Sequence, residues 1–277
     1  MANRADDVVS NPCERWMEFK NGEIVEYDKT TEKNIVHSKP FTFIVLEDLS
    51  TIKGFHTDLE IGIYSNEVRN LKEEILNVRT KKDTIATGYY DDIKETIKAK
   101  GGKFNKSIYI MFKDSTGKMV MGNLMIGGSA LAGGKLADKV TEVPGYMEFS
   151  TKFRGDILKK SVKVLKEVTE CKKGSNVYNV PNFAIQEITP ETNQEAIEMA
   201  KTIREYLNKY LHDNLVKYRE HIKNQEALTK PPANAPAGNS RSNEEPKMSN
   251  HEAIMGTPEP RVESQVVDNE PIDDLPF

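Results

Sequence analysis

The sequence has few of the residues that form metal sites or disulfide frameworks. Among its 277 residues there are two cysteines, Cys13 and Cys171, and five histidines. Neither cysteine has a second cysteine or a histidine at metal-ligand spacing, and no His-Glu-x-x-His pair occurs. The sequence therefore predicts no zinc site and no disulfide framework. Two isolated cysteines are typical of a reducing compartment, and we expect the cytoplasm.

Long apolar runs and catalytic motifs are missing as well. No run of apolar residues is long enough to cross a bilayer, so we expect no membrane contact. The glycine-rich stretch 127–134 does not match a Walker phosphate loop, because Ser129 replaces its first glycine and Leu136 its magnesium-binding hydroxyl. No nucleophile and base stand at the spacing of a catalytic pair. We therefore expect neither an enzyme nor a bound cofactor.

Charge is divided unevenly along the chain. The tail that starts at Lys230 has four basic and nine acidic side chains, which leaves 35 basic and 34 acidic ones in the body. A near-neutral body can still bind a polyanion if its lysines gather on one face. The tail is rich in Pro, Asn, Ser, Ala and Glu, and such a composition buries too little apolar surface to fold. We expect it to be disordered.

The alternation of apolar residues predicts a mainly β body with added helices, of the α+β class. The clearest strand is 39–47, in which both faces are apolar, as expected of a central strand in a closed or two-layered sheet. The other strand-like stretches are 59–63, 104–112, 119–126, 146–153, 161–168 and 176–188. Five or more strands with inserted helices fit an elaborated OB-fold barrel.

Apolar residues three or four apart predict three helices. Two of them are short, at 65–78 and 89–99. The third is long and begins with Thr189 as N-cap and Pro190 in the first turn. A single apolar stripe runs along this helix, so we expect it to pack on its own domain, with pairing to a second copy as the alternative.

Lysines and aromatic rings recur together in several segments, most densely in 98–109. Rings can stack on the bases of a single strand while lysines follow its phosphates. For each ring, core packing is the alternative: stacking is favoured for Phe55, in an expected loop, and the core for Tyr109, in mid-strand. The candidate residues are Lys53, Phe55, Lys81, Lys82, Tyr89, Tyr90, Lys100, Lys103, Phe104, Lys106, Tyr109, Lys152, Phe153 and Arg154.

The last five residues form a compact acidic hook, made of Asp273, Asp274, Leu275, Pro276 and Phe277. The ring of such a hook fills an apolar pocket of a partner, while basic residues around that pocket hold the carboxylates. This tip resembles the acidic tip of bacterial and phage single-stranded DNA-binding proteins. The resemblance implies recruitment of replication and recombination proteins, such as a polymerase, primase, helicase or nuclease.

The body is similar to the larger, divergent single-stranded DNA-binding proteins of tailed phages. Three stretches carry this resemblance: FTFIVL at 41–46, IYSNEV at 63–68 and GGKFNKSIY at 101–109. It implies sequence-independent binding that protects single-stranded DNA during replication, recombination and repair. If a phage encodes the chain, the compartment is the host cytoplasm.

We therefore expect four parts in the chain. They are a loose leader at 1–15, an OB-fold DNA-binding domain at 16–188, an amphipathic helix packed on that domain at 189–225, and a disordered acidic tail with a protein-binding tip at 226–277. A homo-oligomer is left open. Two other functions also remain open: a protein-interaction adaptor that does not bind DNA, and a recombination protein that anneals single strands.

Overall fold

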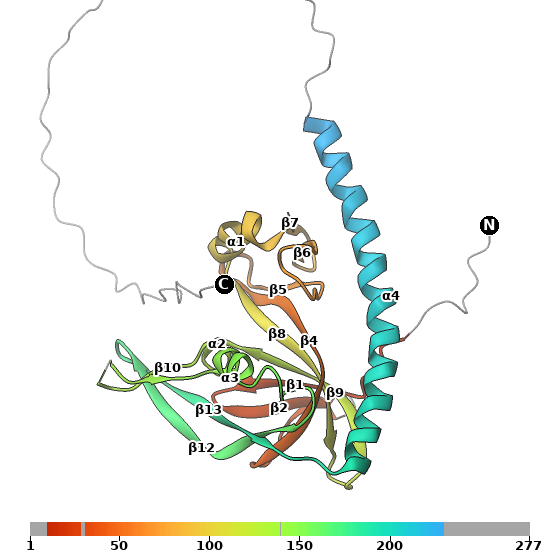
Figure 1. Cartoon of the computed structure of the whole chain (residues 1–277). Coiled ribbons are helices and arrows are strands. Elements are labelled where there is room, and N and C mark those ends of the chain that lie inside the picture. The colour runs from red at the N-terminus through yellow and green to blue at the C-terminus, as the bar shows by residue number, and fades with distance from the viewer. Residues whose placement is uncertain (1–9, 29–30, 139, 230–277) are drawn as a thin grey trace, which may run out of the picture. The chain divides into compact units, whose positions relative to one another are not determined.

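The computed structural model describes residues 10–28, 31–138 and 140–229 (Figure 1). The chain divides into a unit of residues 1–224, to which the following description refers, and a second unit of residues 225–277. Of the second unit only residues 225–229 are described, as the end of a helix. The acidic tail from residue 230 and its tip, Asp273 to Phe277, lie outside the described residues.

Most strands belong to one large mixed sheet of 11 strands. The main path through this sheet is β3-β2-β1-β9-β8-β4-β5-β6-β7, and all its pairs are antiparallel except β1 with β9. The strands on this path are β1 (Arg15–Lys20), β2 (Glu23–Asp28), β3 (Lys33–Val36), β4 (Phe41–His56), β5 (Ile61–Ser65), β6 (Leu76–Arg79), β7 (Thr84–Gly88), β8 (Gly102–Lys113) and β9 (Met119–Gly127). A second, two-stranded sheet pairs β10 (Gly134–Lys135) with β11 (Glu142–Val143).

Strand β4 connects the parts of the large sheet because it has three partners. It pairs with β8 along almost its whole length, with β12 (Ser161–Lys173) over residues 41–44 and with β5 over residues 53–56. Strand β12 in turn pairs with β13 (Asn176–Gln186). Strands are the predominant element among the described residues, so the predicted α+β class with mainly β content is confirmed. Within the described residues the sheet does not close into a barrel.

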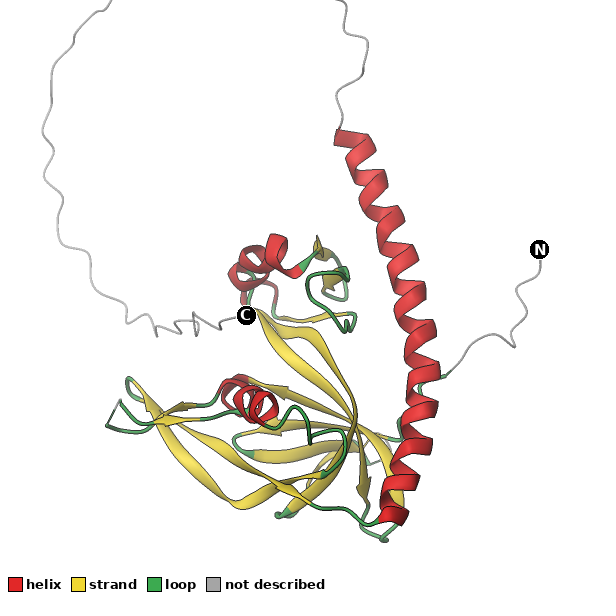
Figure 2. Ribbon diagram, in the orientation of Figure 1, coloured by secondary structure: helices red, strands yellow, loops and turns green. Residues whose placement is uncertain are grey.

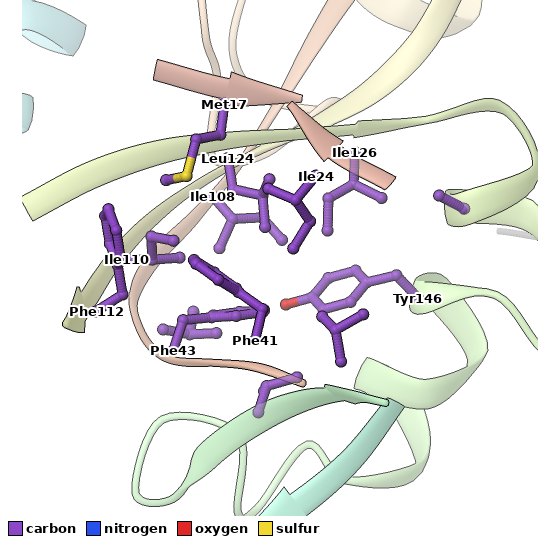
Figure 3. Packing of buried hydrophobic residues seen from close by; sticks show 14 of the residues in the cluster. Met17, Ile24, Phe41, Phe43, Ile108, Ile110, Phe112, Leu124, Ile126 and Tyr146 are labelled. Carbon is purple, nitrogen blue, oxygen red and sulfur yellow. The ribbon is translucent and has the colours of Figure 1, made fainter. Parts of the chain in front are cut away.

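The main hydrophobic core lies between one face of the sheet and a layer formed by β12, β13, α2 (Gly128–Ala132) and α3 (Tyr146–Lys152). Figure 3 shows Tyr146 of α3 pointing toward Phe41 and Phe43 of β4, with Ile108 and Ile110 of β8 beside them. We call the sheet face that carries Ile108 and Ile110 the core face. Its side chains are almost fully withdrawn from water, which is the main stabilising contribution to such a domain.

The other face of the sheet packs against α4 (Pro190–Thr229), the long helix beside the sheet in Figure 2. Leu49 and Tyr109 lie on this face, which we call the α4 face, and they contact Ile203 and Leu207 of the helix. The hydroxyl of Thr189 accepts a hydrogen bond from the backbone of Thr192, as expected of the predicted N-cap. The predicted long helix is therefore confirmed, and its apolar stripe lies on the chain's own sheet.

Packing against the sheet begins at Cys13, inside the range predicted as a loose leader. Its side chain is buried in the cluster beneath α4, and the backbone amide of Glu14 donates to the carbonyl of Met121 on β9. Burial is the largest of the effects that raise the pKa of the Cys13 thiol to about 12. This cysteine therefore acts as a core residue and not as a reactive thiol.

Two of the predicted elements are wrong. The helix predicted at 65–78 is a turn followed by β6, because Asn66 makes hydrogen bonds with the backbones of Ile75 and Asn77, and Asn70 with that of Lys72. Short amide side chains that bond nearby backbone offer the chain an alternative to a helix. The strand predicted at 146–153 is α3, whose buried positions recur at helical spacing. The helix predicted at 89–99 is confirmed as α1 (Tyr90–Ala99).

Replacing Leu207 by Ala should lower the free energy of unfolding by about 2–5 kcal/mol, since this side chain has 0% exposure between α4 and the sheet. Urea unfolding followed by circular dichroism measures the change. The control is Val216→Ala on the same helix, where the side chain is 46% exposed and we expect almost no effect. Equal losses in the two variants would contradict the packing of α4 on the sheet.

Candidate nucleic-acid interface

Four exposed side chains form a row across neighbouring strands of the α4 face, beyond the part that the helix covers. Lys103 of β8 pairs with Lys53 of β4, Lys53 with Tyr64 of β5, and Tyr64 with Arg79 of β6. Directly paired residues of adjacent strands lie on the same face. The guanidinium carbon of Arg79 is 5.2 Å from the centroid of the Tyr64 ring, within cation–π range. The row therefore joins three cations and one ring.

Phe55 lies on the same face as the row, two residues beyond Lys53 on β4. The prediction that it lies in a loop is wrong, because β4 continues to His56. Its ring is nevertheless 54% exposed, and its paired residue on β5 is Gly62, which has no side chain to cover it. A β-carbon on Gly54 would meet the carbonyl of Gly101, so glycine is what allows β4 to lie this close to the turn before β8.

A pocket of about 550 Å³ adjoins the row and is lined in part by Lys53. Its aromatic lining comes from four elements: Trp16 of β1, Tyr64 of β5, Tyr109 of β8, and Tyr206 and Tyr210 of α4. Trp16 is the only tryptophan of the chain and is 43% exposed. The rings of Tyr206 and Tyr210 are stacked, with centroids 5.9 Å apart and an interplanar angle of 22°. Exposed rings beside a cation are suited to bind flat, anionic ligands.

Glu18 of β1 places a negative charge against this basic row. Its carboxylate forms ion pairs with Lys53 and, at 2.6 Å, with Lys20. Partial burial raises the pKa of Glu18, but the hydrogen bonds from the two lysines outweigh it and hold the pKa below its usual value. Glu18 is therefore ionised at neutral pH and remains ion-paired with Lys53 as long as no other anion binds this lysine.

A second carboxyl group, that of Glu67, lies in the lining of the pocket. It accepts hydrogen bonds from the hydroxyls of Ser107 and, at 2.6 Å, Tyr109, and the Asn123 amide donates to the Ser107 hydroxyl at 2.7 Å. The backbone amide of Glu67 donates to the Tyr210 hydroxyl, which connects this network to α4. Burial raises the pKa of Glu67, while the two hydroxyls lower it by a smaller amount.

The structure brings together only some of the predicted residues. Lys53, Phe55 and Lys103 share the exposed part of the α4 face, and Lys81 and Lys82 follow Arg79 in the exposed turn after β6. Tyr89, Tyr90 and Lys100 lie at the ends of α1, where Tyr90 packs on Phe104 at a centroid distance of 5.9 Å.

The remaining predicted residues are placed elsewhere. Tyr109 is 1% exposed beneath α4 and has no ring face free for a base, as the core alternative predicted. Lys106 is ion-paired with Asp48 at 3.1 Å. Lys152, Phe153 and Arg154 lie at the end of α3, whose core packing is against the core face and not the α4 face.

Sequence reasoning missed Trp16, Tyr64, Arg79 and Tyr206. Tyr64 could have been found, because in the strand 61–65 it alternates with the buried Ile63 and must point outward. Trp16 and Tyr206 gave no local signal. They reach the pocket only because β1 pairs with β9 and α4 crosses the sheet, both of which are contacts between segments distant in the sequence.

Comparison with family models, with curated proteins and with solved structures finds no match to this chain. In the part of the chain that the structure describes, no group of three or more His, Cys, Asp or Glu side chains could hold a metal ion. No helix among the described residues is long and apolar enough to cross a membrane. The candidate interface therefore stands on its own geometry.

The raised pKa of Glu67 makes stability depend on pH. The folded state binds this proton more tightly than the unfolded state, so the resulting stabilisation is full below the ordinary Glu pKa of 4.5 and is lost as pH rises through the raised value. Glu67→Gln removes the titration, and the stability of this variant relative to the native chain should rise as pH increases.

Urea unfolding at several pH values between about 4 and 8 measures this difference. The matched control for a Glu-to-Gln change is Glu170→Gln at an exposed position on β12. Parallel stability curves for Glu67→Gln and the native chain would show that burial does not perturb Glu67.

Proposed function

We propose that the chain binds single-stranded DNA on the exposed part of the α4 face, without catalysis. The observation that carries the proposal is the row of Lys103, Lys53, Tyr64 and Arg79 across four strands, next to the exposed ring of Phe55. At a strand spacing of about 4.8 Å, such a row extends over about 14 Å, enough to follow a nucleic-acid backbone past several phosphates.

The chemistry of the row suits a single strand better than a duplex. Rings contribute about 1–3 kcal/mol for each base that stacks on them, and only unpaired bases expose both faces. Cationic side chains beside the rings on the same sheet face can neutralise phosphates, and this contribution to the affinity does not depend on the base sequence. Phe55 and Tyr64 supply rings and Lys53, Lys103 and Arg79 supply charge, so the proposed binding is largely independent of sequence.

An OB-type body is part of this proposal. OB folds are five-stranded, partly open Greek-key barrels that bind oligonucleotides on the face of strands 2 and 3 and with two loops. A β4 of 16 residues with an irregularity between Val45 and Glu47, its long pairing with β8 and a parallel pair between β1 and β9 are compatible with a barrel that is not fully closed.

The proposed role is protection of single strands during DNA replication, recombination and repair. In this role the tip, from Asp273 to Phe277, recruits a polymerase, primase, helicase or nuclease through its ring and carboxylates. The support for this part is the sequence of the tip and its resemblance to the acidic tips of single-stranded DNA-binding proteins. A cytoplasmic location is part of the same proposal.

Binding of oligo-dT by the full chain, followed by the fluorescence of Trp16 over a salt series, tests the proposal. We expect quenching, because the only tryptophan lies at the pocket beside the row. The affinity should fall with salt, with a slope of about −0.7 in log K against log salt for each phosphate contact. No binding at low salt would overturn the proposal and favour an adaptor that binds only proteins.

Two pairs of variants locate the binding face. Lys103→Ala should reduce the salt slope by about 0.7, whereas Lys172→Ala, an exposed lysine on β12, should leave it unchanged. Tyr64→Ala should weaken binding by about 1–3 kcal/mol. Its control is Tyr27→Ala on β2, a ring that is 53% exposed and separated from β4 by three strands. Equal effects of variant and control would place the DNA elsewhere.

A further inference from the structure

The pocket beside the row has a polar side that phosphate binding does not use. Glu67, Tyr109 and Asn123 form part of its lining, together with the rings of Trp16 and Tyr206. Its volume of about 550 Å³ lies within the range of about 300–1,000 Å³ typical of sites for small organic ligands. The lining combines flat apolar rings with a carboxylate, so a suitable ligand is flat and has N–H groups at its edge.

The hydrogen-bond network fixes the Glu67 carboxylate as an acceptor. Asn123 donates to Ser107, Ser107 donates to Glu67, and Tyr109 donates to the other carboxylate oxygen. An ionised carboxylate has about four acceptor positions, and these hydroxyls use two of them. The remaining positions can accept hydrogen bonds from a ligand, and donors from the protein hold the group in place for it.

Lys53 connects this pocket to the proposed path of the DNA. It belongs both to the lining of the pocket and to the row across the strands. A strand whose phosphates follow the row therefore passes the opening of the pocket. A base that leaves the stack at this point can enter the pocket, since single-stranded nucleic acid can present the Watson–Crick edge of an unstacked base.

We propose that the pocket receives one guanine base of the bound strand, whose N1–H and N2–H groups donate to the Glu67 carboxylate while its ring packs among Trp16, Tyr64 and Tyr206. Guanine is the DNA base with two adjacent N–H donors on this edge. Thymine presents one N–H between two carbonyl oxygens, which a carboxylate repels. The inference deepens the proposed function and rests on it for the path of the strand.

The consequence is a local base preference within otherwise sequence-independent binding. Oligo-dT with one central dG should bind the native chain about tenfold more tightly than oligo-dT, which is within the range for one good bidentate contact to a base. Oligo-dT with one central dA should not show this gain. Competition against a labelled oligo-dT measures both, and it needs no altered protein.

Glu67→Gln provides the test of the residue. The amide oxygen remains an acceptor, but the NH₂ group of the same side chain opposes the guanine donors, so the affinity for dG-containing oligo-dT relative to plain oligo-dT should fall from about tenfold to about one. Glu170→Gln on β12 is the matched control and should keep the full preference. Equal affinity of the native chain for dG-containing and plain oligo-dT would overturn the inference.

A third measurement separates this inference from the proposed function. dGMP and dTMP are each titrated into the full chain while Trp16 fluorescence is followed. If no oligonucleotide binds but dGMP alone quenches Trp16 and Glu67→Gln abolishes the quenching, the pocket is a guanine site and the strand-binding proposal fails. If oligonucleotides bind with equal affinity for all bases, the strand-binding proposal stands and the pocket inference fails.

Discussion

The antiparallel pairing of β4 with β8 is the interaction on which the rest of the structure depends. It runs from Phe43 opposite Phe112 to Gly54 opposite Gly102, with one irregularity between Val45 and Glu47. At one end of this ribbon, the side chains on both faces belong to hydrophobic clusters. The other end carries Lys53 and Lys103 on the exposed part of the α4 face. A shift of one residue in this pairing would exchange the faces and bury the cations.

Local sequence predicted the elements of this ribbon well. Alternation between apolar positions identified β8, β9 and β4 as far as residue 47, but not the rest of β4, and the N-cap at Thr189 identified the start of α4. The failures at 65–78 and 146–153 have a common physical cause. Short segments with apolar residues at mixed spacing do not determine their own backbone, so side-chain bonds such as those of Asn66 and packing such as that of Tyr146 decide the outcome.

The candidate site was predictable only where neighbours in the sequence are also neighbours in the fold. Lys53 and Phe55 lie on one strand, and Lys103 is their partner across a single pairing. The exclusion of Tyr109 and the inclusion of Tyr206 depend instead on where α4 lies over the sheet. That position results from the fit of an apolar stripe to one sheet face, and it cannot be read from either segment alone.

The ion pair between Glu18 and Lys53 affects the number of small ions that this surface releases when it binds a nucleic acid, which is the quantity that a salt titration measures. When a nucleic acid releases small ions, each freed ion contributes mixing entropy to binding. An anion that engages Lys53 must instead displace a carboxylate that stays attached to the protein and gains no such entropy. Lys53 therefore carries its own tethered counterion, and the number of ions released on binding should be smaller than the number of phosphates held.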